Sequence, residues 1–460
     1  MAMTSADVVR APVRLALSPL ACLLAVVHAG IRRPSFVVAG TVLLICLPSG
    51  LGDIASSGRI TVADLAAGCV VAVLAVRLLA GERSTVRRGW LPFAFALAAF
   101  AIATVSATDV AAAAVGFIRY SELFVLVPVA VAMSLRDRLD VLLVAGAIVT
   151  VTVVEGAIGV YQYLTGTGAS YAGQDVRAVG TFGAEQVLAL GALIGYGLVV
   201  TLALAFAMTG RLRIALFAAS AFLLLPLGLT LSRGAWIATA CAVVVLLVIA
   251  SWRLATVLIG MAALAVAIAV FGAGDGAGGS DPGSNGLDQR VTSIVSSGSA
   301  PDQSVKDRYA LWHAAVAIWA DHPVAGVGLK DFAAYRDSYA SVELSAGSDV
   351  GDSSSGISRE PLLSAHNQYL MVLSEQGTIG ILAFGGLLVA LGLGAVRRRE
   401  SLLPAREQRF LDLAAPAVMV WTLIDFLYGD IGAGPTSVLL AVVLGLVARR
   451  SLIIPRAVLS

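Results

Sequence analysis

Long apolar segments recur along this chain and limit what it can fold into. A helix needs about 20 consecutive apolar residues to cross the roughly 30 Å hydrocarbon core of a bilayer, and segments of this kind occur repeatedly here. The shorter alternating segments typical of barrel strands are absent. Of the 460 residues, 58% are hydrophobic and 13% are charged, and this charged share is about half that of an ordinary soluble domain. The sequence therefore predicts an all-α membrane protein.

About twelve segments have the length and apolar character of a transmembrane helix. They lie at 35–50, 62–80, 90–107, 117–134, 138–162, 184–208, 212–230, 234–251, 253–271, 366–395, 410–428 and 433–448. A further stretch, 13–29, is short and flanked by arginine. It is either a thirteenth span or, as we favour, a helix lying in the membrane interface.

Arginine residues predict the direction of the spans, because cytoplasmic loops of membrane proteins are enriched in basic residues. One set of alternate loops contains Arg32, Arg33, Arg83, Arg87, Arg88, Arg136, Arg138, Arg211, Arg213, Arg253, Arg397, Arg398, Arg399, Arg406, Arg409, Arg449, Arg450 and Arg456. The opposite short loops contain only Arg59, Arg177 and Arg233. We therefore expect the first set to be cytoplasmic and a large loop, 272–365, to face the outside. The N-terminal region, 1–271, would hold about nine spans and the C-terminal region, 366–460, about three.

The large loop is predicted to contain two amphipathic helices. The first carries an apolar stripe, spaced by three and four residues, that consists of Val305, Tyr309, Trp312, Val316 and Trp319. It should stop at His322-Pro323. The second should begin near Asp331, with one face formed by Phe332, Tyr335, Tyr339 and Val342. The Gly- and Ser-rich segments 272–303 and 345–358 are expected to be flexible.

A continuous helix over 366–395 would be about 45 Å long at 1.5 Å per residue. This exceeds the thickness of the hydrocarbon core, which is about 30 Å. We therefore expect its first turns, with His366, Asn367 and Gln368, to stand in the outer interface or in a wet cavity.

Five polar residues are expected to meet at the outer end of the bundle on topology alone: Arg177, Arg233, Arg308, His366 and Asp425. Guanidinium groups bind phosphate oxygens through two parallel hydrogen bonds and keep their charge at any relevant pH. Three arginines at one membrane mouth therefore favour a polyanionic ligand such as a pyrophosphate. Alternatively, each arginine anchors the chain at the interface or pairs with a local carboxylate.

His366 is the best candidate for a general base. If Ser364 is the N-cap, His366 lies in the first helical turn, where the positive helix end disfavours the imidazolium form. A neutral imidazole can accept a proton. Alternatively, His366 only caps or hydrogen-bonds at the interface.

Charged residues inside predicted spans are candidates for function. Arg119 and Glu122 are three residues apart on one helix and are expected to neutralise each other. Glu155 and Glu375 are candidates to orient a substrate hydroxyl or a catalytic group; alternatively, Glu375 forms a hydrogen bond within the bundle.

Motifs for metals and nucleotide cofactors are absent from the sequence. There is no HExxH or zinc-ligand spacing, no Walker A sequence and no dinucleotide fingerprint. The cysteines, Cys22, Cys46, Cys69 and Cys241, lie in apolar segments without a CxxC pair. We therefore expect neither a metal site nor a cofactor.

Several segments, in this order and spacing, resemble the O-antigen ligase and Wzy-type O-antigen polymerase family of bacterial membrane proteins. They are Ser232-Arg-Gly-Ala-Trp236, Arg308-Tyr-Ala-Leu-Trp312, His322-Pro-Val-Ala-Gly-Val-Gly-Leu-Lys-Asp-Phe332, His366-Asn-Gln-Tyr-Leu370 and Ser374-Glu-Gln-Gly-Thr-Ile-Gly380. The resemblance covers about 177–380 in order and spacing. One departure is Ala184-Glu185-Gln186 after Gly183, where the family often has Asn-Pro-Asn, and this puts the role of Arg177 in doubt.

The resemblance implies a metal-independent, inverting glycosyl transfer from a glycan on undecaprenyl pyrophosphate to an acceptor hydroxyl. The reaction would take place at the outer face of the bacterial cytoplasmic membrane. His366 matches the family's catalytic histidine, and Arg233 and Arg308 match its pyrophosphate-binding arginines. We expect further substrate-binding or supporting roles for Arg177, Trp312, Asn367, Tyr369, Glu375 and Asp425.

Three alternatives stay open. A ligase and a polymerase share the donor and differ in the acceptor, which is a glycolipid or protein in one case and another glycan in the other. A transporter or flippase of lipid-linked glycans is an alternative of a different class. Such transporters often have paired inverted repeats, and this sequence has no convincing repeat.

Overall fold

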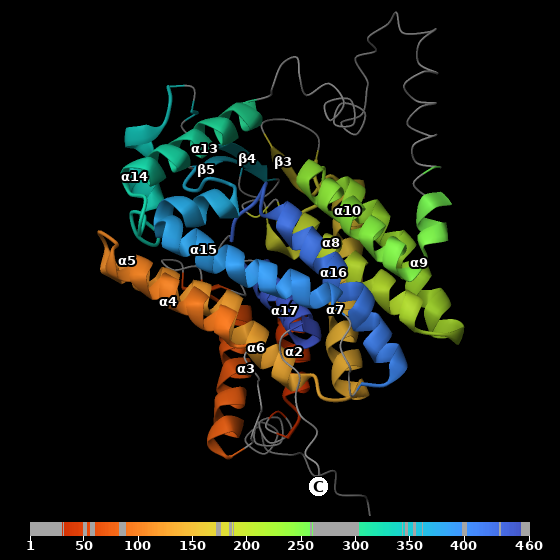
Figure 1. The fold of residues 1–460 in the computed structure, drawn as a ribbon. Helices are drawn as coiled ribbons and strands as arrows, with labels where there is room; N and C mark the ends of the chain where they lie inside the picture. Colours follow the sequence, from red (N-terminus) through yellow and green to blue (C-terminus); the bar gives the residue numbers. More distant parts are fainter. Residues whose placement is uncertain are drawn as a thin grey trace, which may run out of the picture.

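The computed structural model describes residues 30, 32–48, 53–55, 60–81, 89–171, 176–183, 186, 188–257, 260, 303–342, 344–345, 348–352, 356–360, 362–397, 403–431 and 434–451. Three predictions lie outside these residues: the interfacial helix at 13–29, most of the span at 253–271, and nearly all of the flexible segment 272–303. The described part is predominantly helical (Figure 1).

The helices agree closely with the apolar segments. Those of the membrane region are α2 (Pro34–Leu43), α3 (Val62–Leu79), α4 (Leu91–Val105), α5 (Val110–Ser121), α6 (Val127–Ser134), α7 (Arg138–Thr165), α8 (Ala189–Ala207), α9 (Gly210–Leu229), α10 (Arg233–Ala250), α15 (Gln368–Val396), α16 (Ala405–Asp425) and α17 (Pro435–Ser451). Short turns of other helix types are η1 (Leu44–Cys46), η2 (Glu122–Leu126), which is a π-helix that joins α5 to α6, and η3 (Gly180–Phe182).

Seven helical stretches within the described residues are long and apolar enough to cross a membrane. They are Val62–Leu79, Val110–Ser134, Arg138–Thr165, Ala189–Ala207, Gly210–Leu229, Arg233–Ala250 and Gln368–Val396. The apolar helices Pro34–Cys46 and Leu91–Val105 are shorter. The multi-span helical architecture is thus confirmed, and the count of about twelve spans stays a prediction.

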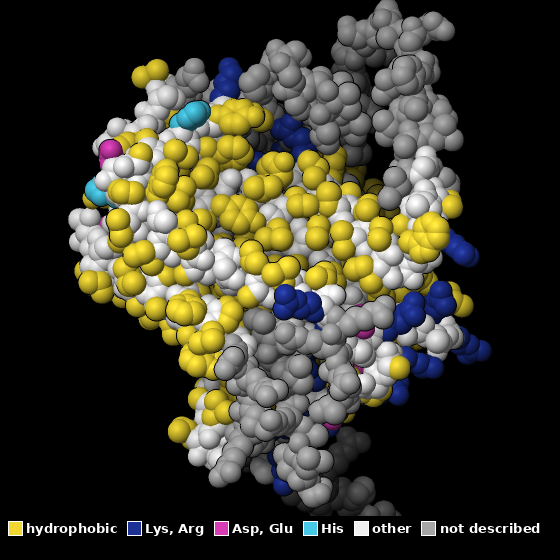
Figure 2. All heavy atoms as spheres, in the orientation of Figure 1, with side chains coloured by type: hydrophobic (Ala, Val, Ile, Leu, Met, Phe, Trp, Pro, Cys, Tyr) yellow, Lys and Arg dark blue, Asp and Glu magenta, His cyan; other side chains and the backbone are white. Residues whose placement is uncertain are grey.

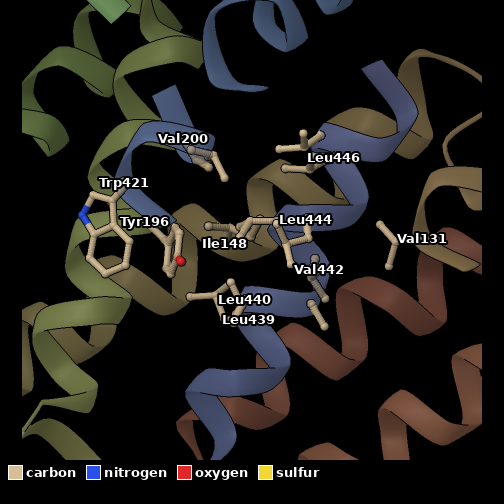
Figure 3. Close-up of a cluster of buried hydrophobic side chains, with 14 of the residues drawn as sticks. Val131, Ile148, Tyr196, Val200, Trp421, Leu439, Leu440, Val442, Leu444 and Leu446 are labelled. Carbon is tan, nitrogen blue, oxygen red and sulfur yellow. The ribbon is translucent and has the colours of Figure 1, made fainter. Parts of the chain in front are cut away.

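The centre of the bundle is α17, which is apolar around most of its circumference and is therefore buried on all sides. Figure 3 shows its side chains among those of α6, α7, α8 and α16. The labelled residues of this cluster are Val131, Ile148, Tyr196, Val200, Trp421, Leu439, Leu440, Val442, Leu444 and Leu446.

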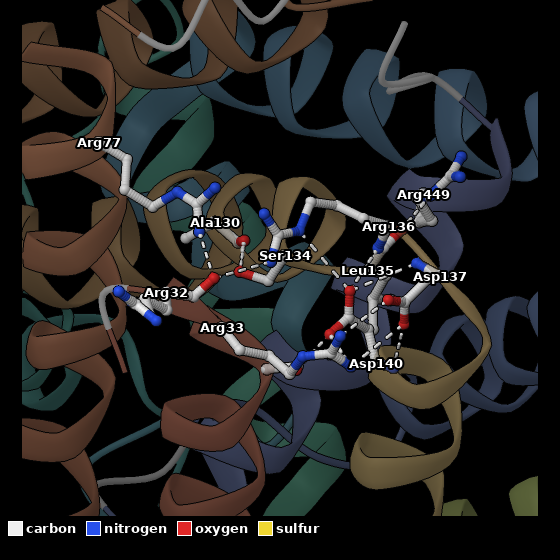
Figure 4. Close-up of polar contacts among 11 residues, drawn as sticks. Arg32, Arg33, Arg77, Ala130, Ser134, Leu135, Arg136, Asp137, Asp140 and Arg449 are labelled. Atoms are coloured by element: carbon white, nitrogen blue, oxygen red, sulfur yellow. Dashed lines mark hydrogen bonds and ion pairs between the residues drawn. The ribbon is translucent and has the colours of Figure 1, made fainter. Parts of the chain in front are cut away.

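One end of the bundle gathers many of the arginines, and we call it the arginine side. Arg33 donates to Asp137 at 3.0 Å, and Arg449 donates to the carbonyl of Leu135 at 2.8 Å (Figure 4). Arg138 pairs with Glu407 at 3.1 Å. The buried carboxylate of Asp140 accepts from Ser35 Oγ at 2.5 Å and lies within ion-pair distance of Arg33 and Arg136. These contacts connect the ends of α2, α6, α7, α16 and α17 on one side of the bundle. The arginine pattern predicted that these helix ends lie on the same side.

The opposite end, which we call the loop side, carries the two predicted loop helices, α13 (Gln303–Asp321) and α14 (Phe332–Tyr339) (Figure 1). The end of α13 directly precedes His322-Pro323, and α14 begins directly after Asp331, as predicted. Their shared core consists of Leu311, Ala315, Ile318, Val327, Phe332, Leu362 and Ala365. The predicted apolar stripe of α13 is therefore not its core-facing side. The neighbouring stripe, with smaller side chains, fits the closer packing, and Tyr309 and Val316 are exposed.

Part of the 345–358 segment, predicted to be flexible, is a β-hairpin of β4 (Ser348–Asp352) and β5 (Gly356–Glu360). A third strand, β3 (Ala169–Tyr171), pairs antiparallel with β4. The large loop is thereby joined to the loop between α7 and α8. The prediction missed this sheet because its strands come from segments about 180 residues apart, and local composition does not report such pairing. A second, two-stranded sheet joins β1 (Asp53–Ala55) and β2 (Ile60–Thr61).

The prediction of a continuous 45 Å helix over 366–395 is wrong. Gly377 breaks α15 with φ 64° and ψ −161°. The backbone groups released at the break bind the Pro323–Gly328 turn of the large loop. The N–H groups of Val327 and Gly328 donate to the carbonyls of Ser374 and Glu375 at 3.1 and 2.9 Å. In return, the N–H groups of Thr378 and Ile379 donate to the carbonyls of Pro323 and Val324 at 2.8 and 3.2 Å. A broken helix is tolerated at membrane depth only when its backbone groups find such partners.

Candidate functional site

His366 lies on the loop side, immediately before α15. Its backbone is left-handed, with φ 47°, which is uncommon for a residue with a Cβ. The N-cap of α15 is Asn367, whose Oδ1 accepts from the N–H of Leu370 at 3.1 Å. The prediction that Ser364 caps the helix is therefore wrong, and His366 precedes the first turn. Ser364 Oγ instead accepts from the N–H of His366 at 3.3 Å.

The large loop holds the segment that carries His366. The indole Nε1–H of Trp312, on α13, donates to the carbonyl of Ala365 at 3.0 Å. Ala365 itself is fully buried in the loop core. The position of His366 therefore depends on the packing of α13, which also carries Arg308.

Two charged residues act on the imidazole of His366. Burial lowers the pKa of His366 below its usual 6.5, the positive field of Arg308 lowers it further, and the negative field of Asp430 opposes both. The lowered pKa keeps the ring neutral at neutral pH. This is the protonation state that was predicted, although the cause is burial and Arg308 instead of a helix N-terminus.

A turn after α16, residues 425–431, binds the start of α15. The N–H of Gln368 donates to the carbonyls of Phe426 and Gly429 at 2.9 and 3.0 Å, and its Oε1 accepts from the N–H of Ile431 at 2.9 Å. Gln368 Nε2 also donates to the hydroxyl of Tyr120 at 3.0 Å. The backbone on which His366 depends is thus fixed by buried hydrogen bonds.

Two residues predicted to bind substrate also connect the start of α15 to the end of α16 and the turn that follows it. Asn367 Nδ2 donates to the carbonyl of Leu427 at 3.3 Å, and the hydroxyl of Tyr369 donates to the carbonyl of Leu423 at 2.9 Å. Asp425, also predicted, closes the turn through its carbonyl, which accepts from Tyr428 and Gly429. The carboxylate whose field reaches His366 is that of Asp430, which the prediction missed although it follows the same predicted span.

Arg233 is the first residue of α10. Its N-cap is Ser232, whose side chain accepts from the N–H of Ala235 at 3.4 Å. The next residue, Gly234, faces Tyr428, because a Cβ added at Gly234 would lie 3.3 Å from the Cβ of Tyr428. The Arg233 end of α10 and the His366 segment therefore flank the same 425–431 turn.

Arg177 lies at the same corner of the loop side. Its backbone exchanges two hydrogen bonds with Ala169, at 2.7 and 3.1 Å, and the next residue, Ala178, donates to the carbonyl of Leu229 at 3.1 Å. Leu229 ends α9, three residues before Ser232. The side chain of Arg177 is buried. Of the departing segment Ala184-Glu185-Gln186, the first two residues lie outside the described residues.

The carboxylates inside the predicted spans have structural partners. Glu155 accepts from the N–H and the hydroxyl of Thr181 at 2.9 and 2.7 Å. Glu375 accepts from the N–H of Phe332 at 3.4 Å, at the start of α14. The contact of Glu375 agrees with the alternative prediction of a hydrogen bond inside the protein, although its partner belongs to the large loop.

The predicted neutralisation of Arg119 by Glu122 is corrected by the structure. Arg119 forms its ion pair with Asp64 of α3 and donates to Ser437 Oγ, on α17, at 2.6 Å. A partner on another helix cannot be read from spacing along one helix. Within the described residues, no three His, Cys, Asp or Glu side chains come together in a way that could hold a metal ion.

The fold and the site define a class: a multi-span helical membrane protein whose large loop holds a histidine and an arginine at one end of the bundle. Residues 214–385 match the family model described as O-antigen ligase. This range, 214–385, is therefore similar to the O-antigen ligase family, in agreement with the resemblance noted in the sequence. Arg233, Arg308 and His366 all lie inside the matched range. No curated protein matches the chain.

The family consists of glycan ligases and polymerases, which are enzymes of the glycosyltransferase type. Together with the apolar helices, the match indicates a multi-pass protein of the bacterial inner membrane.

Proposed function

We propose that the protein transfers a glycan from undecaprenyl pyrophosphate to an acceptor hydroxyl, with inversion and without a metal ion, at the outer face of the inner membrane. The reaction would be that of an O-antigen ligase. The observation that carries the proposal is a partly buried imidazole whose pKa is lowered by burial and by the positive field of Arg308, within the range that matches the O-antigen ligase model.

In this proposal His366 is the general base. Its neutral ring accepts the proton of the acceptor hydroxyl as the acceptor oxygen attacks the anomeric carbon. The bond from that carbon to the pyrophosphate oxygen breaks on the opposite face, and its electron pair leaves with the lipid pyrophosphate. Asp430 then stabilises the imidazolium that forms.

Arg233 and Arg308 stabilise the negative charge that develops on the departing pyrophosphate. They come from different elements, α10 and α13, and flank the 425–431 turn and the His366 segment. Arg177, buried at the same corner, supports this anion site. Trp312, Asn367, Tyr369, Glu375 and Asp425 hold the backbone around it.

The test is reconstitution of the full chain in proteoliposomes with a lipid-pyrophosphate glycan and candidate acceptors. The products are followed by mass spectrometry. His366→Ala should lower the transfer rate by about 100-fold or more, which is the contribution typical of a general base. Arg233→Ala should cause a loss of similar size, because removal of one charge-stabilising donor costs roughly 100- to 1,000-fold.

The matched control is His313→Ala, since His313 is exposed on α13, five residues beyond Arg308. It should transfer at the wild-type rate. Gel filtration of each variant checks that it is folded. Wild-type rates in both His366→Ala and Arg233→Ala would overturn the proposal.

The same assay separates ligase from polymerase. A ligase adds one glycan to a glycolipid or protein acceptor, whereas a polymerase converts the donor alone into a ladder of products. A donor that crosses the bilayer without any transfer would instead indicate a flippase.

A further inference from the structure

The outer side of the large loop carries an apolar ridge, formed by Tyr309, Val316 and Val324, that does not pack into the core of the loop. Tyr309 and Val316 of α13 are 53% and 44% exposed, and Val324, just after α13, is 65% exposed. The core-facing side of the same helix is formed by other residues, Leu311, Ala315 and Ile318 among them. A row of exposed apolar side chains on a helix marks a surface that contacts something other than water.

The ridge lies directly beside a membrane-spanning helix. Trp319 Nε1–H, on the same stripe, donates to Thr378 Oγ1 of α15 at 3.2 Å. The carbonyl of Val324 accepts from the N–H of Ile379 at 3.2 Å. The ridge therefore reaches α15 where its second half begins.

That half of α15 exposes apolar side chains of its own. Ile379 and Leu382 are 37% and 71% exposed, and their helix is long and apolar enough to span a membrane. Figure 2 shows hydrophobic side chains over the regions of α13 and α15 on one face of the molecule. The apolar surface of α13 is thus continuous with a surface that faces lipid.

The charge beside the Tyr309 end of the ridge is positive. Lys306 is exposed one turn before Tyr309. Of the two carboxylates of α13, Asp307 is buried and accepts from the N–H and the hydroxyl of Ser345, both at 2.8 Å. The other, Asp321, lies at the far end of the helix and accepts from the hydroxyl of Tyr339 at 2.8 Å. An apolar side bordered by lysine is the pattern of a helix that lies in a membrane interface.

We propose that α13 lies in the bilayer leaflet at the loop side. Tyr309, Val316 and Val324 enter the boundary between headgroups and acyl chains, and Lys306 binds the phosphate of an anionic phospholipid. The large loop is then anchored to lipid on one side and to α14 and α15 on the other. This inference does not depend on the proposed reaction.

The test uses spin labels on the full chain in vesicles, after replacement of the four native cysteines by serine. Labels are placed at Val316→Cys and, as a matched control on the same loop, at Asp337→Cys, whose native side chain is exposed. Collision of each label with oxygen, which concentrates in lipid, is compared with collision with a water-soluble nickel chelate. We expect oxygen to dominate at Val316 and the chelate to dominate at Asp337.

The lipid headgroup is tested by comparing vesicles of phosphatidylcholine alone with vesicles that also contain phosphatidylglycerol. Phosphatidylglycerol should move the Val316 label deeper. Lys306→Gln should abolish this shift, and Arg213→Gln, on the arginine side, should leave it unchanged. Dominance of the chelate at Val316 in both vesicles would overturn the proposal. So would a label that enters lipid only after undecaprenyl phosphate is added, because the ridge would then serve a substrate tail.

Discussion

At the scale of single residues, His366 depends on neighbours that are distant in sequence. Its left-handed backbone stores strain of about 1–3 kcal/mol, which the surrounding structure must offset. Trp312 holds the preceding carbonyl and the 425–431 turn holds the following residues. Arg308 and Asp430 act on its ring with opposite fields. The chemistry of one imidazole is therefore set by three separate segments.

A pH prediction follows from the lowered pKa of His366. A base must be deprotonated, so kcat/KM should fall only when the pH drops through the pKa of the ring. Because the folded protein lowers this pKa, the midpoint should lie below 6.5. Asp430→Asn removes the field that raises the pKa, so the midpoint should shift further down. The pH profile of kcat/KM measures both, with Asp337→Asn as a control; an upward shift in Asp430→Asn would contradict the assignment.

At the scale of elements, the break in α15 joins the membrane region to the large loop. Four backbone hydrogen bonds connect Ser374–Ile379 with Pro323–Gly328, so the loop replaces the helical partners that the break removes. The second half of α15 crosses the bundle and the first half presents the His366 segment. The break requires a glycine at position 377, because the positive φ and the close approach of the loop both exclude a Cβ.

Gly377→Ala should destabilise the protein, whereas Gly385→Ala should not. At Gly377 a Cβ would meet backbone atoms of Val324 and Gly326, and the backbone conformation, with φ 64° and ψ −161°, is nearly restricted to glycine and costs another residue about 1–3 kcal/mol. At Gly385, in the same helix, a Cβ would meet nothing within 4 Å, so alanine should be neutral or stabilising by up to about 1 kcal/mol. Thermal unfolding in detergent compares the two. Equal midpoints would mean that the break is not maintained by Gly377.

At the scale of the whole molecule, the two ends of the bundle differ in character. The arginine side is held by ion pairs that join the start of α2 to the start of α7, and α7 and α17 to α16. Figure 4 shows the contacts around Arg33 and Asp140. The loop side brings together the ends of α9 and α16, the starts of α10 and α15, and the loop helices. The positive-inside rule then predicts that the loop side faces outward.

Cysteine labelling in intact cells tests this orientation. In a background without the native cysteines, a membrane-impermeant maleimide should label Asp337→Cys on the loop side. It should label Arg211→Cys on the arginine side only after the membrane is opened. Both native side chains are exposed, so access to the reagent decides the result. The reverse pattern would put the proposed site in the cytoplasm and end the proposed reaction.

Local patterns in the sequence determined much of this protein. Apolar length predicted the helices, arginine spacing predicted which helix ends meet, and His322-Pro323 and Asp331 predicted the end of α13 and the start of α14. The motifs predicted the family and pointed to Arg233, Arg308 and His366. Such features are readable because they depend on neighbours within a few residues or on one-dimensional charge counts.

Contacts between distant segments were decided only by the tertiary structure. They include the pairing of β3 with β4, the pairing of Arg119 with Asp64, the field of Asp430 on His366, and the loop that fills the break at Gly377. The core-facing side of α13 was also decided by the tertiary structure. The helix has two adjacent apolar stripes that its own sequence does not distinguish, and the packing of α14 and the 362–365 segment selects one of them. Each of these depends on which surfaces fit together in space, and the order of residues along one helix does not contain that information.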